Sequence, residues 1–359
     1  MPAGLDELRA LLPAARVEVL GELGGSTRSS VHRVRADSRT VIVKEFTNSP
    51  DGWVRECAAL SVLPPDAPTP RLIAAGAAPP TVVMSDVGSG PSVADALLGD
   101  DPARAADAVV AWARSMASLH RVTTGSRPAF RNALAAYAGD RTVEESTVST
   151  GLDAAARTID QHGTELGIDV AAAALRELRG LSTRLGSAGP AALTPADACP
   201  DNNVFRDDTL ILIDFEGAQW RHLAWDIAYL SVPWPSCWCS WRLPEEISER
   251  AIDAYRAALA LPYADSPLFR ADVAAAAVGW AFVSASWFLP AALRDDPPLT
   301  GSARPGPTRR AMILHRLGLA RSSAEFPALA ELAGRLRDAL ADRWGAEPLG
   351  YAPAFVQHR

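Results

Sequence analysis

The chain has 359 residues, of which 48% are hydrophobic, enough apolar material for more than one core at the usual ~100–200 residues per domain. The formal net charge is −7 at pH 7. Charges of neither sign form long runs, which excludes the basic stripe typical of nucleic-acid binding. Apolar stretches such as 274–280 are interrupted well short of the ~20 residues of a membrane span, and the N-terminus shows no secretory signal. We therefore expect a cytoplasmic protein without nucleic-acid or membrane partners, and the oligomeric state stays open.

The first ~90 residues predict a small antiparallel sheet with one main helix. A glycine- and serine-rich loop at 21–30 separates the first two strands, and a β-branched strand at 40–46 carries Lys44 near its end. The predicted strands lie at 17–20, 31–34, 40–46, 71–75 and 81–84, and the predicted helices at 5–12 and 52–63. A Gly/Ser/Pro linker at 86–91 then separates an N-terminal lobe, 1–88, from a C-terminal lobe, 89–359.

The C-terminal lobe has helical spacing almost throughout, with one strand-like hairpin at 203–213. The predicted helices lie at 92–98, 102–121, 129–138, about 152–186, 222–230, 245–260, 266–290 and 323–343. The sequence thus predicts an α+β fold made of a small sheet lobe and a large helical lobe.

Two scarce residue types mark positions of interest. Lys44 is the only lysine among 35 basic residues. In a chain so rich in Arg, we expect the single Lys to persist where the wide guanidinium fork does not fit and one compact ammonium does. Asn is also rare, and Asn202 and Asn203 are two of only four.

Polar residues flank both ends of the predicted hairpin. Asp197 and Asn202 precede it and Asp214 follows it, so the three side chains can converge at one edge. Two carboxylates and an amide oxygen form the hard ligand set that suits Mg²⁺, which binds through protein carboxylates together with substrate phosphates. The pattern therefore indicates phosphoryl transfer.

These residues resemble the motifs of the aminoglycoside phosphotransferase and choline-kinase family, the small-molecule branch of the protein-kinase-like fold. Asp197, four intervening residues and Asn202 match its catalytic loop, and Asp214-Phe215-Glu216 matches its second motif. The resemblance implies a two-lobed kinase-like fold, with Asp197 as catalytic base and Asn202 and Asp214 as magnesium ligands. It also implies ATP or GTP as phosphoryl donor.

The N-terminal segment agrees with this resemblance, which covers about residues 18–232. Lys44 falls where the family places the lysine that pairs with the α- and β-phosphates, and Glu56 where a helical glutamate orients that lysine. The remaining nucleotide contacts that we expect are the loop residues Gly24, Gly25, Ser29 and Ser30 and the adenine hinge Met84, Ser85, Asp86 and Val87.

Two positions depart from the family pattern. The His and Gly that precede the catalytic Asp are here Pro195 and Ala196, so another group must brace the loop. A catalytically degenerate nucleotide-binding module that acts through partners is therefore an alternative to a kinase. His120 favours a packing or capping role, and we expect Asp226 to hold the catalytic loop by hydrogen bonds.

The cysteines and tryptophans of the segment 233–241 leave two alternatives each. Cys237 and Cys239 could supply two metal ligands, but no third Cys or His follows at finger spacing. Reduced thiols are expected, because the four cysteines are too scattered for a disulfide framework. Trp234 and Trp238 belong either to the core or to a substrate wall.

The substrate-wall interpretation places acidic residues beside these rings: Glu216, Glu245 and Glu246. An amine-bearing or partly apolar alcohol would suit such a wall. The predicted function is transfer of a phosphoryl group to a hydroxyl of a small molecule, such as an antibiotic, an amino alcohol or a sugar. Only ten residues separate Phe215 from the Asp226 segment, too few for the activation segment of a protein-directed kinase.

Overall fold

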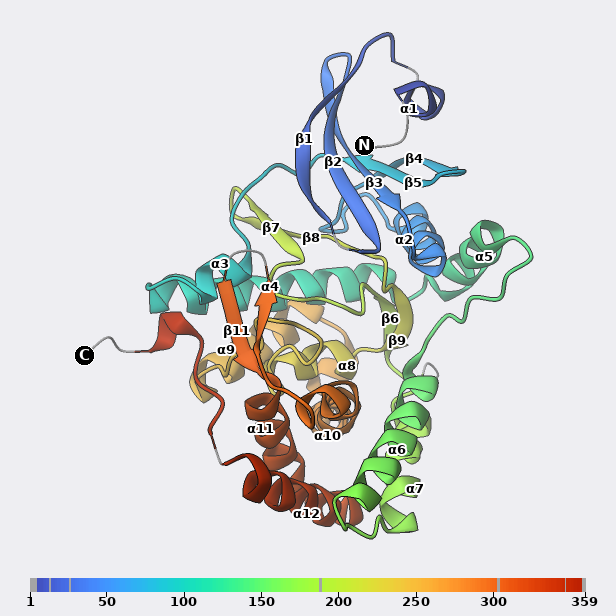
Figure 1. The fold of residues 1–359 in the computed structure, drawn as a ribbon. Coiled ribbons are helices and arrows are strands. Elements are labelled where there is room, and N and C mark those ends of the chain that lie inside the picture. Colours follow the sequence, from blue (N-terminus) through green and yellow to red (C-terminus); the bar gives the residue numbers. More distant parts are fainter. Residues whose placement is uncertain are drawn as a thin grey trace.

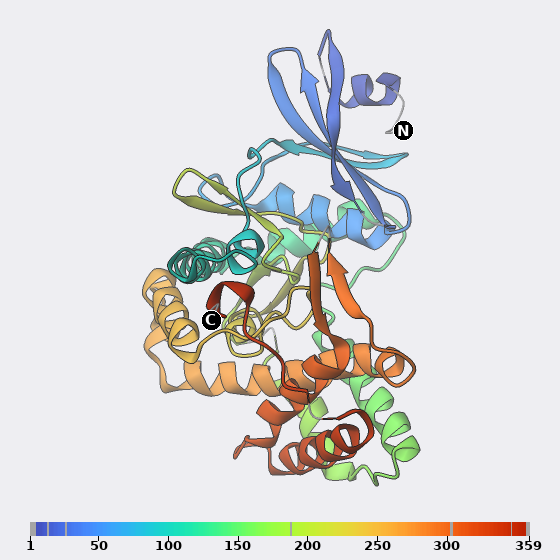
Figure 2. The same ribbon diagram turned by 60° about the vertical axis from the view of Figure 1, so that its left-hand side comes forward.

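The computed structural model describes residues 5–12, 14–25, 27–186, 189–301, 304–345 and 347–356. A five-stranded antiparallel sheet of order β1-β2-β3-β5-β4 lies at one end, and a mostly helical lobe fills the rest (Figures 1 and 2). The sheet strands are β1 (Val17–Gly25), β2 (Ser29–Ala36), β3 (Arg39–Phe46), β4 (Leu72–Ala77) and β5 (Pro80–Ser85). The α+β fold class predicted from the sequence is confirmed.

The first hairpin is tighter than the sequence predicts. Most of the expected loop at 21–30 is strand, because Gly24 pairs with Val31 and Gly25 with Ser30. Two register shifts in β1, after Val19 and after Glu22, allow the pairing with β2 to continue to the end of the strand. Thr27 and Arg28 lie between the two strands, and Ser26 lies outside the described residues.

One helix covers the inner face of this sheet. The short α1 (Leu5–Leu11) packs on the opposite face, where Leu8 joins a core cluster with Val34 and Val83. The helix α2 (Pro50–Val62) begins with Pro in its first turn and Asp51 beside it, and ends before Pro64. Val54, Cys57 and Ala58 of α2 are fully buried and belong to a core that continues into the helical lobe. The helix therefore joins the sheet to the lobe below it.

The helical lobe contains ten described helices and three two-stranded ribbons. The helices are α3 (Val93–Leu97), α4 (Pro102–Thr123), α5 (Arg127–Ala138), α6 (Val148–Glu165), α7 (Ala172–Arg184), α8 (Ala224–Ile227), α9 (Glu245–Leu259), α10 (Pro267–Ala292), α11 (Arg309–Arg321) and α12 (Pro327–Trp344). The ribbons pair β6 (Ala191–Thr194) with β9 (Gln219–His222), β7 (Asn203–Arg206) with β8 (Thr209–Leu212), and β10 (Pro298–Gly301) with β11 (Arg304–Thr308). Three short 3₁₀ turns are η1 (Ala228–Leu230), η2 (Pro262–Asp265) and η3 (Pro353–Phe355).

Several predictions for this lobe were wrong. The helix expected at about 152–186 is two helices, broken where Gly167 adopts a φ of +71°. The ribbons β6–β9 and β10–β11 and the helix α11 were not predicted. The two strands of β6–β9 are four residues each and far apart in the sequence, so neither gives a local strand signal.

The helix α10 is long and apolar enough to cross a membrane, with an 18-residue window of mean hydropathy 1.5. However, 72% of that window is buried within the protein. In both views the helix runs through the lobe with other helices around it (Figures 1 and 2). It is the central core helix of the C-terminal lobe. The lobe boundary at 88–89 stays a prediction.

Candidate active site

The hairpin β7–β8 lies between the sheet and the helical lobe (Figures 1 and 2), and Asn202 and Asp214 flank its two ends. Asn203 pairs with Leu212, and the Ile213 amide donates to the Asn202 carbonyl at 3.1 Å. Asp214 itself has a φ of +64°, a left-handed conformation that a non-glycine residue adopts at a cost. The hairpin register thus places the two predicted magnesium ligands at one edge.

Lys44 contacts carboxylates from both lobes. Its Nζ lies 2.7 Å from Glu56 Oε2, 2.7 Å from Asp214 Oδ1 and 3.2 Å from Glu216 Oε2. The Lys44 side chain is 6% exposed and that of Glu56 is 1% exposed. Burial alone would lower the pKa of Lys44, but the three carboxylates outweigh it and hold that pKa above its ordinary value. The ammonium therefore stays charged in the cleft.

This geometry gives a reason for the single lysine. Three carboxylates surround one nitrogen, with the ring of Phe46 at 4.8 Å on another side. A compact ammonium can donate in three directions from one atom, whereas the planar guanidinium fork of Arg would need more room.

Arg28, in the turn of the first hairpin, is a site residue that sequence reasoning missed. Its Nη2 lies 2.8 Å from Glu216 Oε1, so Glu216 lies between the two cations Arg28 and Lys44. Only the serines and backbone of this loop were predicted to contact phosphate. An Arg directly before those serines was the available signal, since it is the side chain best suited to phosphate recognition.

The loop that carries Asp197 is braced although it lacks the family's His. Ala196, with a φ of +62°, donates its amide to Thr194 Oγ1 at 3.1 Å. Its carbonyl accepts from Arg221 Nη2 at 3.2 Å and from the Tyr229 hydroxyl at 3.0 Å. These contacts hold the backbone next to Asp197 in its left-handed conformation.

A second layer holds Arg221 in place. Asp226 is buried and forms an ion pair with Arg221, and His120 Nε2 lies 3.3 Å from the other Asp226 oxygen. Burial would raise the pKa of Asp226, but Arg221 and His120 hold it lowered to about 2. Asp226 thus acts on the catalytic loop through Arg221, and His120, which also contacts Tyr255 at 2.8 Å, lies in the core.

The carboxylate of Asp197 accepts a hydrogen bond and has no salt-bridge partner among the described residues. The Ser236 hydroxyl donates to Asp197 Oδ1 at 2.7 Å. Burial raises the pKa of Asp197, nearby Asp214 and Asp201 add to this rise, and the Ser236 hydrogen bond opposes it. A carboxylate without a strong ion pair can accept a proton, as a general base must.

The expectation of reduced thiols is wrong for two of the four cysteines. Cys199 and Cys237 form a disulfide with Cα atoms 5.8 Å apart, whereas Cys57 and Cys239 are free and buried. The bond joins the catalytic loop to the Trp-rich segment, which are 38 residues apart and adjacent only in space. Both sulfurs lie near the Asp197 carboxylate, but as a disulfide they offer no thiolate to a metal.

The predicted substrate wall is also corrected. Trp234 is fully buried and packs edge-on against Trp112 with ring centroids 5.9 Å apart, so it belongs to the core. The Trp238 indole donates to Asp201 Oδ2 at 2.7 Å and does not line the pocket beside Asp197. Glu216 faces Lys44 and Arg28 instead of an acceptor. Glu245 and Glu246 lie in the first turn of α9, where they complement the helix dipole.

A pocket of about 250 Å³ opens directly beside Asp197, with walls from α6, β9, α8 and α10. Its lining comprises Thr147, Val148, Gly151, Leu152, Ala196, Asp197, Gly217, Gln219, Arg221, Trp225, Ser236, Trp280, Val283 and Trp287. Three tryptophans therefore do lie near the catalytic loop, but they come from α8 and α10. Their positions depend on how α10 packs, which no local motif indicates.

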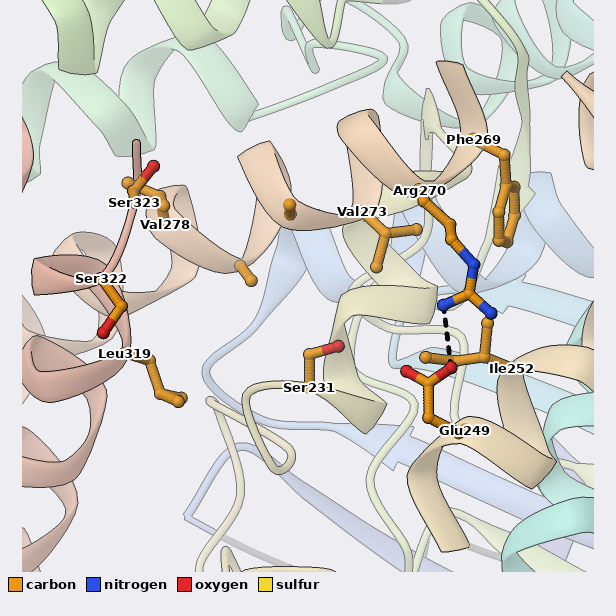
Figure 3. A pocket seen from close by; sticks show the side chains of 12 residues that line it. Ser231, Glu249, Ile252, Phe269, Arg270, Val273, Val278, Leu319, Ser322 and Ser323 are labelled. Atoms are coloured by element: carbon orange, nitrogen blue, oxygen red, sulfur yellow. Dashed lines mark hydrogen bonds and ion pairs between the residues drawn. The ribbon is translucent and has the colours of Figure 1, made fainter. Parts of the chain in front are cut away.

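A second pocket, of about 350 Å³, lies between α9, α10 and the end of α11 (Figure 3). Its apolar floor includes Ile252, Val273 and Val278, and Arg270 and Glu249 form an ion pair at 2.8 Å across it. It shares no lining residue with the pocket beside Asp197. It therefore contributes nothing to the site described above.

The predicted hinge is firmly held. Asp86 pairs with Arg33, with Nε to Oδ2 at 2.7 Å, and accepts the Gly88 amide at 2.9 Å. The Ser85 amide donates to the Arg71 carbonyl at 2.9 Å, which ties the end of β5 to the segment before β4. These contacts fix the backbone of 84–88; its role in receiving adenine stays a prediction, as does that of Met84 and Val87.

The donor chemistry of the hairpin edge fits a magnesium ion. Asp214 offers a carboxylate that is 33% exposed. Asn202 donates its Nδ2 to the Asp197 carbonyl at 2.8 Å, which leaves the amide oxygen as its ligand atom. Two oxygen donors that leave the other positions to phosphate and water are typical of magnesium sites in phosphoryl-transfer enzymes.

Comparison with known proteins gives the same fold. The Plasmodium vivax ethanolamine kinase Pv091845 is 12% identical with a TM-score of 0.53, over 82% of this chain and 80% of that one. The choline kinase LicA from Streptococcus pneumoniae is 13% identical with a TM-score of 0.51, over 94% and 97%. A choline/ethanolamine kinase family protein from Mesorhizobium loti is 17% identical with a TM-score of 0.50, over 93% and 99%.

No curated protein matches the chain in sequence. The family profile described as "Phosphotransferase enzyme family" matches residues 21–280, most of the chain and both sides of the cleft that holds Lys44 and Asp197. The chain belongs to this phosphotransferase family and is a small-molecule kinase with a hydroxyl acceptor.

Proposed function

We propose that the enzyme transfers the γ-phosphoryl group of ATP, with GTP as the alternative donor, to a hydroxyl of a small molecule. One observation carries the proposal: Lys44 Nζ lies 2.7 Å from Asp214 across the cleft, while Asp197 on the adjoining loop presents a carboxylate that has no ion pair in the described part of the chain. Cationic, metal-binding and basic groups are thus assembled from three separate segments of the chain.

The residues divide the work as follows. Lys44, oriented by Glu56, binds the α- and β-phosphates, and Arg28 adds a positive charge from the hairpin turn. Asp197 accepts the proton of the acceptor hydroxyl as that oxygen attacks the γ-phosphorus. The bond between the γ-phosphorus and the bridging oxygen breaks, and the nucleoside diphosphate leaves. Asp214 and Asn202 would hold a magnesium ion, which would supply charge neutralisation on the phosphate oxygens.

The bracing of the catalytic loop supports turnover over the degenerate alternative. Pro195 and Ala196 remove the family's usual support, but Arg221, Tyr229 and Thr194 hold the same backbone. Because catalysis of phosphoryl transfer depends mainly on positioning, a held loop is what an active enzyme needs.

The test is a screen of hydroxylated metabolites and antibiotics with ATP and Mg²⁺, read by mass spectrometry for a phosphorylated product. We expect product with the native enzyme and a loss of at least ~100-fold in Asp197→Asn, with nucleotide affinity retained. Nucleotide binding without product from any acceptor would instead favour the non-catalytic module.

A further inference from the structure

We propose that the pocket beside Asp197 accepts small, uncharged alcohols with an apolar body and discriminates against cationic alcohols. This inference rests on the proposed function, because it assigns the substrate class of the same site. The proposed acceptors differ from those named for the structural relatives. The 12–17% identity to these relatives shows a shared fold alone.

The size of the pocket limits the acceptor. Its volume of about 250 Å³ is below the ~300–1,000 Å³ of pockets that enclose a drug-sized ligand. The deep walls are apolar: Leu152 from α6, Trp225 from α8, and Trp280 and Val283 from α10 are all at least nine-tenths buried. A compact hydrocarbon or aromatic body fits such walls, whereas a multi-ring polyamine does not.

The described lining of the pocket offers an ammonium group no carboxylate of its own. Among the described residues that line it, Asp197 is the one carboxylate, and it is placed to act on the hydroxyl. Arg221 lies in the wall with its guanidinium carbon 5.7 Å from the centroid of the Trp280 ring. The Trp280 ring is therefore already in contact with a cation whose charge is paired with the buried Asp226. An ammonium group would lose its water against these apolar walls without gaining this ring as a free partner.

The neutral polar groups lie where a hydroxyl would be needed. Ser236 Oγ is 2.7 Å from Asp197 Oδ1, so the reactive end of the acceptor belongs beside this pair. Trp287 is 48% exposed and packs edge-on against Trp280 with centroids 5.8 Å apart. An exposed tryptophan at the open side of a pocket, in contact with the buried wall, can cover the apolar end of a bound molecule.

The test compares alcohols that differ in charge alone, such as 3,3-dimethylbutan-1-ol and choline, which have nearly the same shape. We expect the enzyme to have at least a tenfold higher kcat/KM for the neutral alcohol, and its intrinsic Trp fluorescence to change at a lower concentration of that alcohol than of choline. Equal efficiency, a preference for choline, or absence of binding by the neutral members of the panel would overturn the proposal.

Two pairs of variants locate the effect in this pocket. Trp287→Ala should raise KM for the neutral alcohol about tenfold with little change in kcat, whereas Leu268→Ala, at an exposed position of the same helix, should leave it unchanged. Val148→Asp places a carboxylate in the first turn of α6, where it suits the helix dipole, and should shift the preference toward the cation at least about fivefold. Val148→Asn is its uncharged control.

Failure of this inference is distinguishable from failure of the proposed function. Phosphorylation of cationic acceptors in preference to neutral ones would refute the charge discrimination and leave the kinase assignment intact. Absence of product from every acceptor would refute the kinase assignment, and the fluorescence titration would then still decide which member of each pair binds.

Discussion

Replacing Lys44 by Met is expected to destabilise the enzyme strongly, because it removes the ammonium 2.7 Å from the buried Glu56 carboxylate. Glu56 is 1% exposed, so the charge left behind cannot reach solvent. Removal of one partner of a buried ion pair costs about 3–5 kcal/mol, and we expect a loss of this size in the free energy of unfolding. Adding Glu56→Gln removes the stranded charge, so the double variant should recover about 2 kcal/mol.

The loss in the Lys44→Met variant should depend on pH. Burial raises the pKa of Glu56 and Lys44 opposes this rise, so the folded variant without Lys44 holds a proton on Glu56 that the unfolded chain releases. Stability therefore falls as the pH rises above the ordinary pKa of Glu, and the loss is larger at pH 8 than at pH 5. Urea denaturation followed by Trp fluorescence measures both effects. Equal stability of the single and double variants at both pH values would refute the reasoning.

Three further outcomes follow from the contacts described. Ser236→Ala should lower kcat about tenfold by removing the hydrogen bond that orients Asp197, with the free energy of unfolding changed by less than ~1 kcal/mol; steady-state kinetics and urea titration check this. Burial lowers the pKa of His222 to about 4, so the contribution of the neutral imidazole to the free energy of unfolding is fully present above pH ~6.5. Below that pH the free energy of unfolding falls by up to ~1.4 kcal/mol per pH unit toward pH 4. His222→Gln should flatten that slope, and an unchanged slope would contradict it. Gly90→Ala would place Cβ 1.8 Å from a carbonyl oxygen of β7 and should lower the melting temperature, whereas Gly21→Ala, with nothing within 4 Å, should not.

The sequence could predict the parts of the site that lie on local signals. Lys44 ends a β-branched run, and Asn202 and Asp214 flank a short hairpin whose register follows from its own residues. The order of these residues along the chain was enough to predict an α+β fold with a sheet lobe and a helical lobe. The same reasoning predicted that Asp226 would support the catalytic loop, and the ion pair with Arg221 gives the path.

The sequence could not predict what depends on packing between distant segments. The Cys199–Cys237 disulfide and the Ser236 hydrogen bond both require the catalytic loop to meet the segment 233–241, which no periodicity indicates. Trp234 and Trp287 are two further examples of positions that sequence distance does not predict. The tryptophan nearer the motifs in sequence is fully buried, and the one 73 residues beyond Asp214 lines the pocket.

The most direct test asks whether a nucleotide and a divalent cation bind together between Lys44 and the hairpin edge. Titration calorimetry measures the binding of a non-hydrolysable ATP analogue, with and without Mg²⁺, to the native enzyme and to Asp214→Asn. We expect Mg²⁺ to strengthen binding at least about tenfold in the native enzyme and to have little effect in the variant. Binding that ignores Mg²⁺ in the native enzyme, or an equal effect of Mg²⁺ on both proteins, would contradict the placement of the metal at Asp214.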